Sequence, residues 1–400
     1  QRGGIFDSLI ILGDKEDKNN KQVVFVPFYS RGLATARDAW CYNSSSESLN
    51  ANIKRSMDFY NDQRYQLSKG FIKDVEYDLT QISWTTSVLN LALKNQEITQ
   101  DKIGEKVISL YRPFFKQIGY YSRFWNERVY QLPKLFPTSK YKNLVICVKG
   151  IGDQDFSCLI ADCIPDLQVI FNGQCFPLYW YEENKNKQQT LSLFDTESSD
   201  DYIRRDGITD WILKDVRTRF DLKKSLPRIP IVEDIDAFLD FSYAGKQLAN
   251  LHLNYEEIPA YEGVTVIGDR QKEEAPDGRM IAGTTDLYAV KVDYKYYEVE
   301  KMRFPKKGQK DTIIYNSSIR IENIPDEAYE YIVNGKSAIE WIMERYQVKT
   351  DPSSLIKNDP NDWSREHDNP RYILDLLLSV INVSVQTMEI VKKLPDLKLE

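Results

Sequence analysis

Arginine, threonine and aspartate are concentrated in the segment SRGLATARD (residues 30–38). The run KQVVFVPF just before it is rich in β-branched and aromatic residues, which predicts a strand that delivers the polar segment into a turn. An arginine guanidinium presents a planar set of donors that matches guanine O6 and N7 or a phosphate. Arg31, Thr35 and Arg37 are therefore candidate nucleic-acid ligands. The alternative is that the region of Arg37 and Asp38 is held in structural ion pairs.

A second candidate is Lys149, which begins the sequence KGIGD after the apolar run NLVICV. A glycine-rich turn that follows a strand can bind phosphate through its backbone amides. The third glycine of a full GxGxxG pattern is missing here. The sequence therefore favours a tight turn over a nucleotide site.

Basic and aromatic residues are interleaved over residues 291–310, KVDYKYYEVEKMRFPKKGQK. Aromatic rings stack on bases and cations bind phosphates, so Arg303, Lys306 and Lys307 are further candidate nucleic-acid ligands. The alternative is an edge strand whose lysines keep it soluble.

Two carboxylates and a lysine have the spacing of one kind of nuclease core. Asp166 in the sequence IPD, with Glu183 and Lys185 in EENK, resembles the PD-ExK pattern. In that pattern the carboxylates hold Mg²⁺ and the lysine lies near the attacked phosphate. The signal is weak because such a trio also occurs by chance in any charged chain.

The motifs of several enzyme classes are missing from the sequence. It has no GxxxxGK[ST] P-loop, no GxSxG elbow, and no [DNS]PP[YFW] loop of the amino-group methyltransferases. His252 and His367 have no histidine partner at metal-ligand spacing, and no two of the five cysteines form CxxC. We therefore expect no catalytic residues and no metal in this chain, and free thiols in a reducing cytoplasm.

Composition sets further limits on the function. Of the 400 residues, 42% are hydrophobic and 12% aromatic, which is enough to bury a core. The formal net charge of −7 excludes a generally basic protein that coats nucleic acid, but it leaves room for a local basic groove. The best candidate for a membrane segment, YILDLLLSVINVSV, contains Asp375 and is shorter than the roughly 20 residues that span a bilayer, so we expect no membrane contact.

The pattern of apolar residues predicts an α+β fold, in which helical blocks and mixed or antiparallel sheet regions are separate. Helices are expected over residues 46–67 and 101–130, and a buried strand at NLVICVKG. A hairpin is expected over residues 167–182, because the dipeptide Asn172-Gly173 at its centre favours a tight turn.

The second half of the chain is predicted in the same way. Residues 183–206 are expected to form a loop or a domain seam, and residues 262–320 to be largely β-structure. Helical spacing recurs over residues 238–251 and again near the C-terminus, where Ser337 and Glu340 form a capping box before an apolar helix face. A final helix is expected at YILDLLLSVINVSV.

Several longer strings of the chain are similar to one known family. They are YSRGLATARDAWCYN (29–43), GQCFPLYWYE (173–182), GITDWIL (207–213), LPRIP (226–230), AGKQLANLHLNYE (244–256), NGKSAIEWIMERYQV with NDPNDW (334–363), and NPRYILDLLLSVINVSV near the C-terminus. Together they resemble the C-terminal specificity region of Type ISP restriction–modification enzymes. Those enzymes are single polypeptides that combine a nuclease, a helicase-type ATPase, an adenine-N6 methyltransferase and a target-recognition domain. The resemblance covers nearly the whole chain.

The resemblance implies a target-recognition domain that binds double-stranded DNA. It assigns residues 1–20 to the end of the methyltransferase region or a connector, residues 21–230 to the first part of the domain, and residues 231–400 to the second part with C-terminal helices. The expected partners are DNA and the methyltransferase and helicase domains of the same polypeptide, in the cytoplasm. No cofactor is expected in this chain itself, whereas the parent enzyme would use S-adenosylmethionine, ATP and Mg²⁺.

The chain departs from the family pattern after Phe220, where a helical stretch rich in tyrosine and phenylalanine is expected before LPRIP. Either this insert is deleted or residues are missing from the sequence at that point. Two other functions stay open at this stage. One is a Mg²⁺-dependent nuclease built on Asp166, and the other is a module that binds another protein through an aromatic surface.

Overall fold

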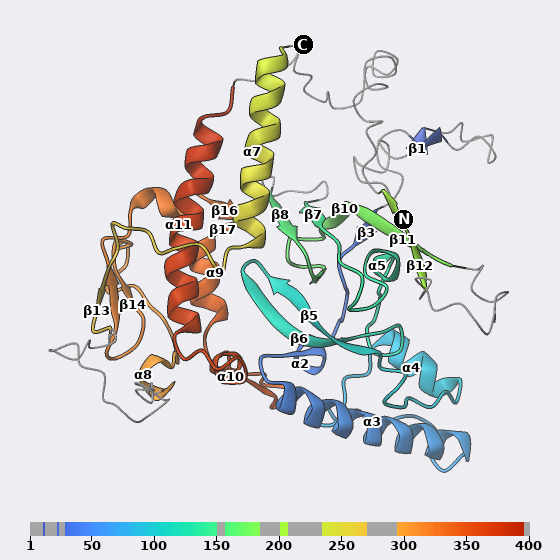
Figure 1. The fold of residues 1–400 in the computed structure, drawn as a ribbon. Coiled ribbons are helices and arrows are strands. Elements are labelled where there is room, and N and C mark those ends of the chain that lie inside the picture. Colours follow the sequence, from blue (N-terminus) through green and yellow to red (C-terminus); the bar gives the residue numbers. More distant parts are fainter. Residues whose placement is uncertain are drawn as a thin grey trace, which may run out of the picture.

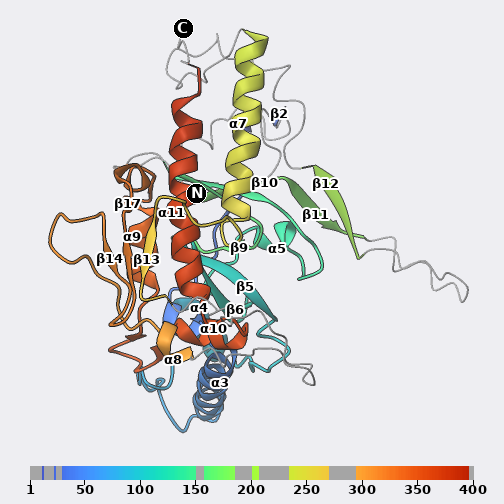
Figure 2. The same cartoon turned by 60° about the vertical axis from the view of Figure 1, so that its left-hand side comes forward.

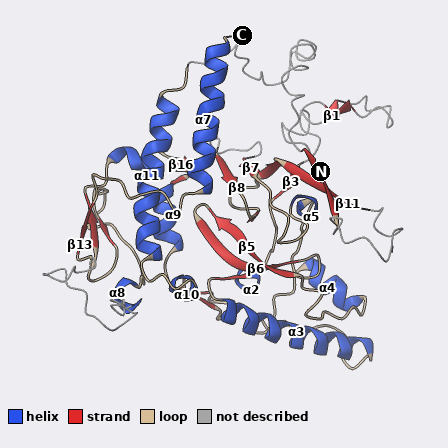
Figure 3. Cartoon of the chain, in the orientation of Figure 1, coloured by secondary structure: helices blue, strands red, loops and turns tan. Residues whose placement is uncertain are grey.

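The computed structural model describes residues 11–12, 22–23, 29–149, 157–184, 201–206, 234–269 and 294–395. These residues form several small sheets and a set of helices, which confirms the predicted α+β class (Figure 1, Figure 3). The long helices α7 (Ile235–Leu253) and α11 (Tyr372–Lys392) run side by side. They lie between a group of short strands and the two larger sheets (Figures 1 and 2).

Two four-stranded sheets form the larger β-structure. The first has the order β3 (Ser30–Arg31), β10 (Gln174–Pro177), β7 (Val145–Val148) and β8 (Cys158–Ala161), and all its neighbours are antiparallel. The second has the order β4 (Tyr42–Asn43), β6 (Phe115–Tyr121), β5 (Glu105–Arg112) and β9 (Ile164–Pro165), and β9 is parallel to β5. The strand predicted at NLVICVKG is thus confirmed as β7.

The helix predicted over residues 101–130 is wrong, because this segment forms the β5–β6 hairpin. Val107, Ile108 and the aromatic residues that follow pack well on a pleated surface, and the helical spacing of the apolar residues was coincidental. The chain reverses at Phe114, whose φ of 56° places it in the left-handed region.

The hairpin predicted over residues 167–182 is also wrong in its pairing. Asn172 has a φ of 51° in a tight turn, as the dipeptide predicts. Strand β10 after that turn pairs with β3 and β7, which are distant in sequence, and not with the residues before the turn. A local turn signal therefore identified the bend but could not identify the partner strands.

The remaining strands are short. They are β1 (Ile11–Leu12), β2 (Gln22–Val23), β11 (Tyr179–Glu183), β12 (Tyr202–Asp206), β13 (Thr265–Ile267), β14 (Ile313–Ile314), β15 (Arg320–Glu322), β16 (Ile332–Val333), β17 (Lys336–Ser337), β18 (Lys349–Thr350) and β19 (Lys357–Asn358). Strand β12 pairs with β11, so the predicted loop over 183–206 is wrong at its end, while residues 185–200 lie outside the described part. Only β13, β14 and β15 occur within the described part of 262–320, which is far less β-structure than predicted.

The other helices are mostly ones that the spacing of neighbouring apolar residues predicts, or are a single turn long. They are α2 (Asp38–Cys41), α3 (Ser46–Ser68), α4 (Thr86–Leu93), α5 (Leu132–Leu135), α8 (Tyr294–Tyr297), the 3-10 helix η3 (Asp326–Tyr329), α9 (Ala338–Arg345) and α10 (Asn361–Glu366). The predicted helices at 46–67, at 238–251 and in the C-terminal region are confirmed as α3, α7, α9 and α11. The capping box at α9 is present, with Ser337 and Glu340 each bonded to the other's backbone.

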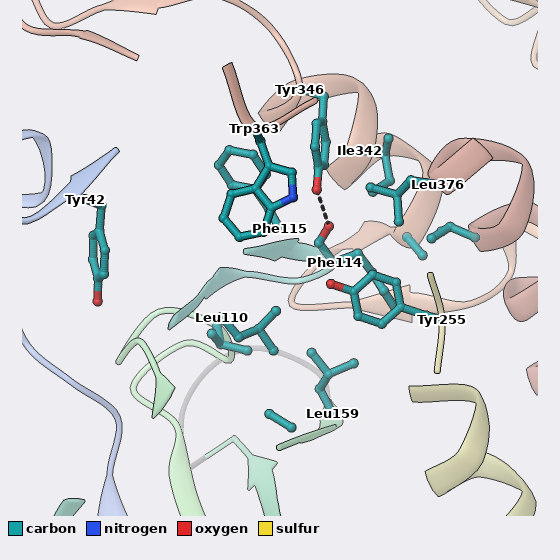
Figure 4. Packing of buried hydrophobic residues seen from close by; sticks show 14 of the residues in the cluster. Tyr42, Leu110, Phe114, Phe115, Leu159, Tyr255, Ile342, Tyr346, Trp363 and Leu376 are labelled. Atoms are coloured by element: carbon teal, nitrogen blue, oxygen red, sulfur yellow. Dashed lines mark hydrogen bonds between the residues drawn. The ribbon is translucent and has the colours of Figure 1, made fainter. Parts of the chain in front are cut away.

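One hydrophobic core connects both parts of the chain. It contains buried side chains from Leu33 to Val385, so residues from 21–230 and from 231–400 pack together. Figure 4 shows the junction, where the β5–β6 turn meets α9 and α11 and the Tyr346 hydroxyl donates to the Phe114 carbonyl at 3.3 Å. Helix α11 is long and apolar enough to cross a membrane, but residues such as Leu377 are fully buried, so it acts as a core helix.

Replacement of Ser337 with alanine should lower the free energy of unfolding by about 1 kcal/mol, because the cap of α9 is lost. The matched control is Ser317→Ala on an exposed loop, which should change stability by no more than about 0.5 kcal/mol. Urea unfolding measures both values. Equal losses in the two variants would show that the cap does not stabilise α9.

Candidate nucleic-acid interface

A network of charged and polar groups fixes the segment SRGLATARD. The Asp38 carboxylate accepts hydrogen bonds from the Thr35 hydroxyl, from the Tyr111 hydroxyl at 2.8 Å and from Arg112 at 3.0 Å. Arg112 also forms an ion pair with Asp166 at 2.9 Å. The segment after β3 is therefore held against β5 and the loop that follows β9.

Two of the three residues predicted in this segment are buried. Thr35 is 2% exposed and Arg37 is 5% exposed. The Arg37 guanidinium lies 4.2 Å from the Trp125 ring centroid and donates to the Trp125 carbonyl at 2.8 Å. Burial lowers the pKa of Arg37. This environment favours a structural role for Thr35 and Arg37 over DNA contact. The ion pair of Asp38 is formed with Arg112 and not with Arg37.

The carboxylates that resembled a nuclease core do not form a metal-binding group within the described part of the chain. Asp166 is 5% exposed, and its oxygens accept from Arg112, from the Tyr42 hydroxyl and from the Gln168 amide. Glu183 lies at the end of β11, and Lys185 lies outside the described residues. Within the described ranges, no group of three histidine, cysteine, aspartate or glutamate residues is placed to hold a metal ion.

Of the three predicted ligands in this segment, Arg31 is the one that reaches the surface. It is half-buried, and its guanidinium lies 5.8 Å from the centroid of the Tyr130 ring. The backbone after Arg31 runs beside residues 128–131, since Ala34 and Arg128 exchange two backbone hydrogen bonds of 3.0 and 2.9 Å. Tyr130 has a φ of 46°, a conformation that is rare for a tyrosine and is often found at functional sites.

We call Arg31, Arg128, Tyr130 and Gln131 the Arg31 surface. Arg128 and Gln131 are exposed, and the backbone amide of Gln131 donates to the Ser30 hydroxyl at 3.1 Å. Sequence reasoning missed Arg128 and Tyr130, which it placed in the helix expected over residues 101–130, and it also missed Gln131, which follows that segment. Their side by side arrangement with Arg31 depends on pairing across about a hundred residues of chain.

The other predicted ligands are placed elsewhere. Lys149 is 5% exposed at the end of β7, and its ammonium has no hydrogen-bond partner among the described residues. Arg303, Lys306 and Lys307 are exposed in the connection from α8 to β14. Strand β14 lies across α11 from β3 (Figure 1). Of the edge strand considered for this segment, the described residues form only an antiparallel bridge between Arg303 and Ile314, with helix α8 and a loop elsewhere.

A family model described as the Type ISP C-terminal specificity domain matches residues 24–220 and 217–376. The chain therefore belongs to this family. The two matched segments overlap over residues 217–220, which end at Phe220, the point after which a departure from the family pattern is expected from the sequence. A comparison with curated proteins gives no match.

Solved structures agree with this assignment. The ATP-dependent Type ISP restriction-modification enzyme LlaBIII bound to DNA is 35% identical, with a TM-score of 0.77, over 100% of this chain and 25% of that chain. A nuclease-deletion mutant of the Type ISP enzyme LlaGI in complex with a DNA substrate mimic is 34% identical, with a TM-score of 0.74, over 100% of this chain and 35% of that one. The cryoEM structure of a DrdV–DNA complex shares the fold at 24% identity, with a TM-score of 0.71 over 96% of this chain and 37% of that one.

The Asp166 carboxyl should give the protein a measurable pH dependence. Burial raises its pKa from 3.8 to about 7, although Arg112 lowers it in part. The protonated carboxyl is thus favoured in the folded state, so its contribution to stability is lost as pH rises from about 4 to about 7. The unfolding free energy of the wild type, relative to that of Asp166→Asn, should therefore fall over this pH range and level off above it.

Comparison of wild type with Asp166→Asn cancels the effect that other titrating groups have on the free energy of unfolding. Burial lowers the pKa of His252 to about 4, which destabilises both proteins equally on acidification. Urea unfolding at several pH values gives the difference. A constant difference from pH 4 to 8 would contradict the assigned environment of Asp166.

Proposed function

We propose that this chain recognises a specific sequence of double-stranded DNA for a larger Type ISP restriction–modification polypeptide. The observation that carries the proposal is the match over the whole chain to two Type ISP enzymes whose structures contain DNA or a DNA mimic. The chain spans only about a quarter to a third of those polypeptides, so methylation, translocation and cleavage would be carried out by other parts.

The Arg31 surface has the chemistry to read bases. Arginine forms two hydrogen bonds with guanine and glutamine forms two with adenine, and each such pair discriminates by about 1–3 kcal/mol. Arg31, Arg128 and Gln131 offer these groups, and Tyr130 supports the Arg31 guanidinium from one side. The backbone pairing of the two segments would hold them in place, which sequence reading requires.

Phosphate contacts would set the position of the DNA without reading its sequence. Arg303, Lys306 and Lys307 are exposed cations suited to that role. The net charge of −7 is compatible with this if the chain holds one side of the duplex and its neighbours hold the other. In the parent polypeptide, S-adenosylmethionine, ATP and Mg²⁺ would serve those neighbouring domains, in the cytoplasm.

Contact with those neighbouring domains is the second candidate function. Helix α7 exposes apolar side chains at helical spacing: Ile235 is 71% exposed, Leu239 55% and Tyr243 65%. An apolar stripe of this kind is typical of a protein contact. This role is compatible with DNA recognition, because one molecule can use different faces for each.

A randomised duplex pool, selected on this chain over a range of salt concentrations, tests the proposed function. We expect enrichment of one short motif and an affinity that falls steeply as salt rises. An absence of enrichment and of salt dependence, both here and with the intact polypeptide, would contradict DNA recognition and favour the protein-contact role alone.

Replacement of Arg31 or Arg128 with alanine should relax selection at individual positions of the motif, with a loss of about 1–3 kcal/mol for the preferred base. Lys94→Ala, which removes one exposed positive charge at the end of α4, is the matched control. Selection on each variant measures the base preference at each position. Uniform weakening without a change in the motif would show that these arginines contact phosphates only.

A further inference from the structure

A cavity of about 300 Å³ lies outside the Arg31 surface, between α2, the β5–β6 hairpin and the connection from α9 to β18. Its walls include the aromatic rings of Tyr42, Tyr111 and Phe115 and the cationic side chains of Arg345 and Lys349. We call it the Arg345 pocket. Its volume is enough for a phosphate group with part of a nucleotide, and it brings together residues from both halves of the chain.

The two cations of the Arg345 pocket lack a full set of partners. The Arg345 guanidinium lies 5.1 Å from the Trp341 ring centroid and contacts Glu344 at 3.1 Å, but its buried Nε has no hydrogen-bond partner among the described residues. Lys349 is exposed at the mouth. Burial lowers the pKa of both groups, and the proximity of Arg345 lowers that of Lys349 further. Such mutual repulsion is relieved when an anion binds between like charges.

Further cations surround this pair. Lys301 and Lys336 each act electrostatically on Lys349, and Arg112 acts on Arg345. The backbone places Lys301 nearby, because the Val348 amide donates to the Glu300 carbonyl at 3.1 Å. The cations therefore come from three separate segments and converge on one site.

The carboxylates at this site are already engaged by groups of the protein. Asp38 accepts from Thr35, Tyr111 and Arg112, and Glu344 is shared between Lys336 and Arg345. Asp351 accepts from the backbone amides of Ser353 and Ser354 at 3.2 and 2.7 Å. These contacts leave Arg345 and Lys349 as the charges best able to receive a ligand from solvent.

We propose that the Arg345 pocket binds a phosphate group of nucleic acid, with Arg345 and Lys349 as its ligands. The aromatic walls would accept the sugar or base attached to that phosphate. The inference that the phosphate belongs to the DNA backbone rests on the proposed function. Binding of a free phosphate does not depend on it. The site adds a contact that positions DNA, on a different element from the base-reading Arg31 surface.

The first test is DNA binding by Lys349→Gln as a function of salt, with Lys94→Gln as the control that loses the same charge. Loss of one phosphate contact should make the slope of log K against log salt less steep by about 0.9 and weaken all sequences equally. The selected motif should stay the same. An unchanged slope and affinity in Lys349→Gln, with DNA bound by the wild type, would overturn the proposal. Arg345→Gln, checked for unaltered thermal unfolding, should give the same result.

The second test uses inorganic pyrophosphate in place of DNA and isothermal titration calorimetry. We expect saturable binding to the wild type and to Lys94→Gln, and its loss in Lys349→Gln. If the wild type binds pyrophosphate but no DNA, the proposed function fails and the pocket stands as a free-phosphate site. If pyrophosphate binding is absent and DNA binding is unaffected by Lys349→Gln, the pocket proposal fails and sequence recognition stands.

Discussion

The ion-pair network of Asp38, Arg112 and Asp166 is the constraint on which the candidate interface depends. It joins α2, strand β5 and the loop after β9, three elements that have few local reasons to meet. Replacement of Arg112 would leave the buried Asp166 carboxyl without its cation, and the loss of one partner from a buried pair typically costs about 3–5 kcal/mol. The network therefore fixes the path of the segment after β3, while the pairing of Arg31 with Gln174 of β10 fixes Arg31 at the start of that segment.

A division of roles follows from this path. Thr35 and Arg37 are buried, and Asp38 is half-buried and held by Tyr111 and Arg112, while Arg31 lies at the surface beside Tyr130. Recognition of different DNA sequences needs base-contacting side chains that can differ from one target to another. The backbone that carries them has to keep the same position. A buried polar network beneath a few exposed arginine and glutamine side chains meets both needs. The Arg345 pocket borders the same network, since Asp38 and Tyr111 line it and Tyr111 donates to Asp38.

Local signals in the sequence were enough to predict several elements but not their partners. Helices α3, α9 and α11 and strand β7 follow from apolar spacing and from the cap at Ser337, which need only neighbouring residues. The β5–β6 hairpin and the partners of β10 depend on contacts between distant segments, which spacing cannot show. In the same way the sequence singled out Arg31 but not Arg128 or Gln131, and it could not show that Arg37 is buried.

The most direct test is a structure of this chain bound to the duplex that selection identifies. We expect Arg31, Arg128 and Gln131 to lie within hydrogen-bond distance of base edges, while Arg37 stays stacked on Trp125 and Asp38 stays paired with Arg112. A duplex bound on another face, with the Arg31 surface exposed to solvent, would show that these residues do not read the sequence.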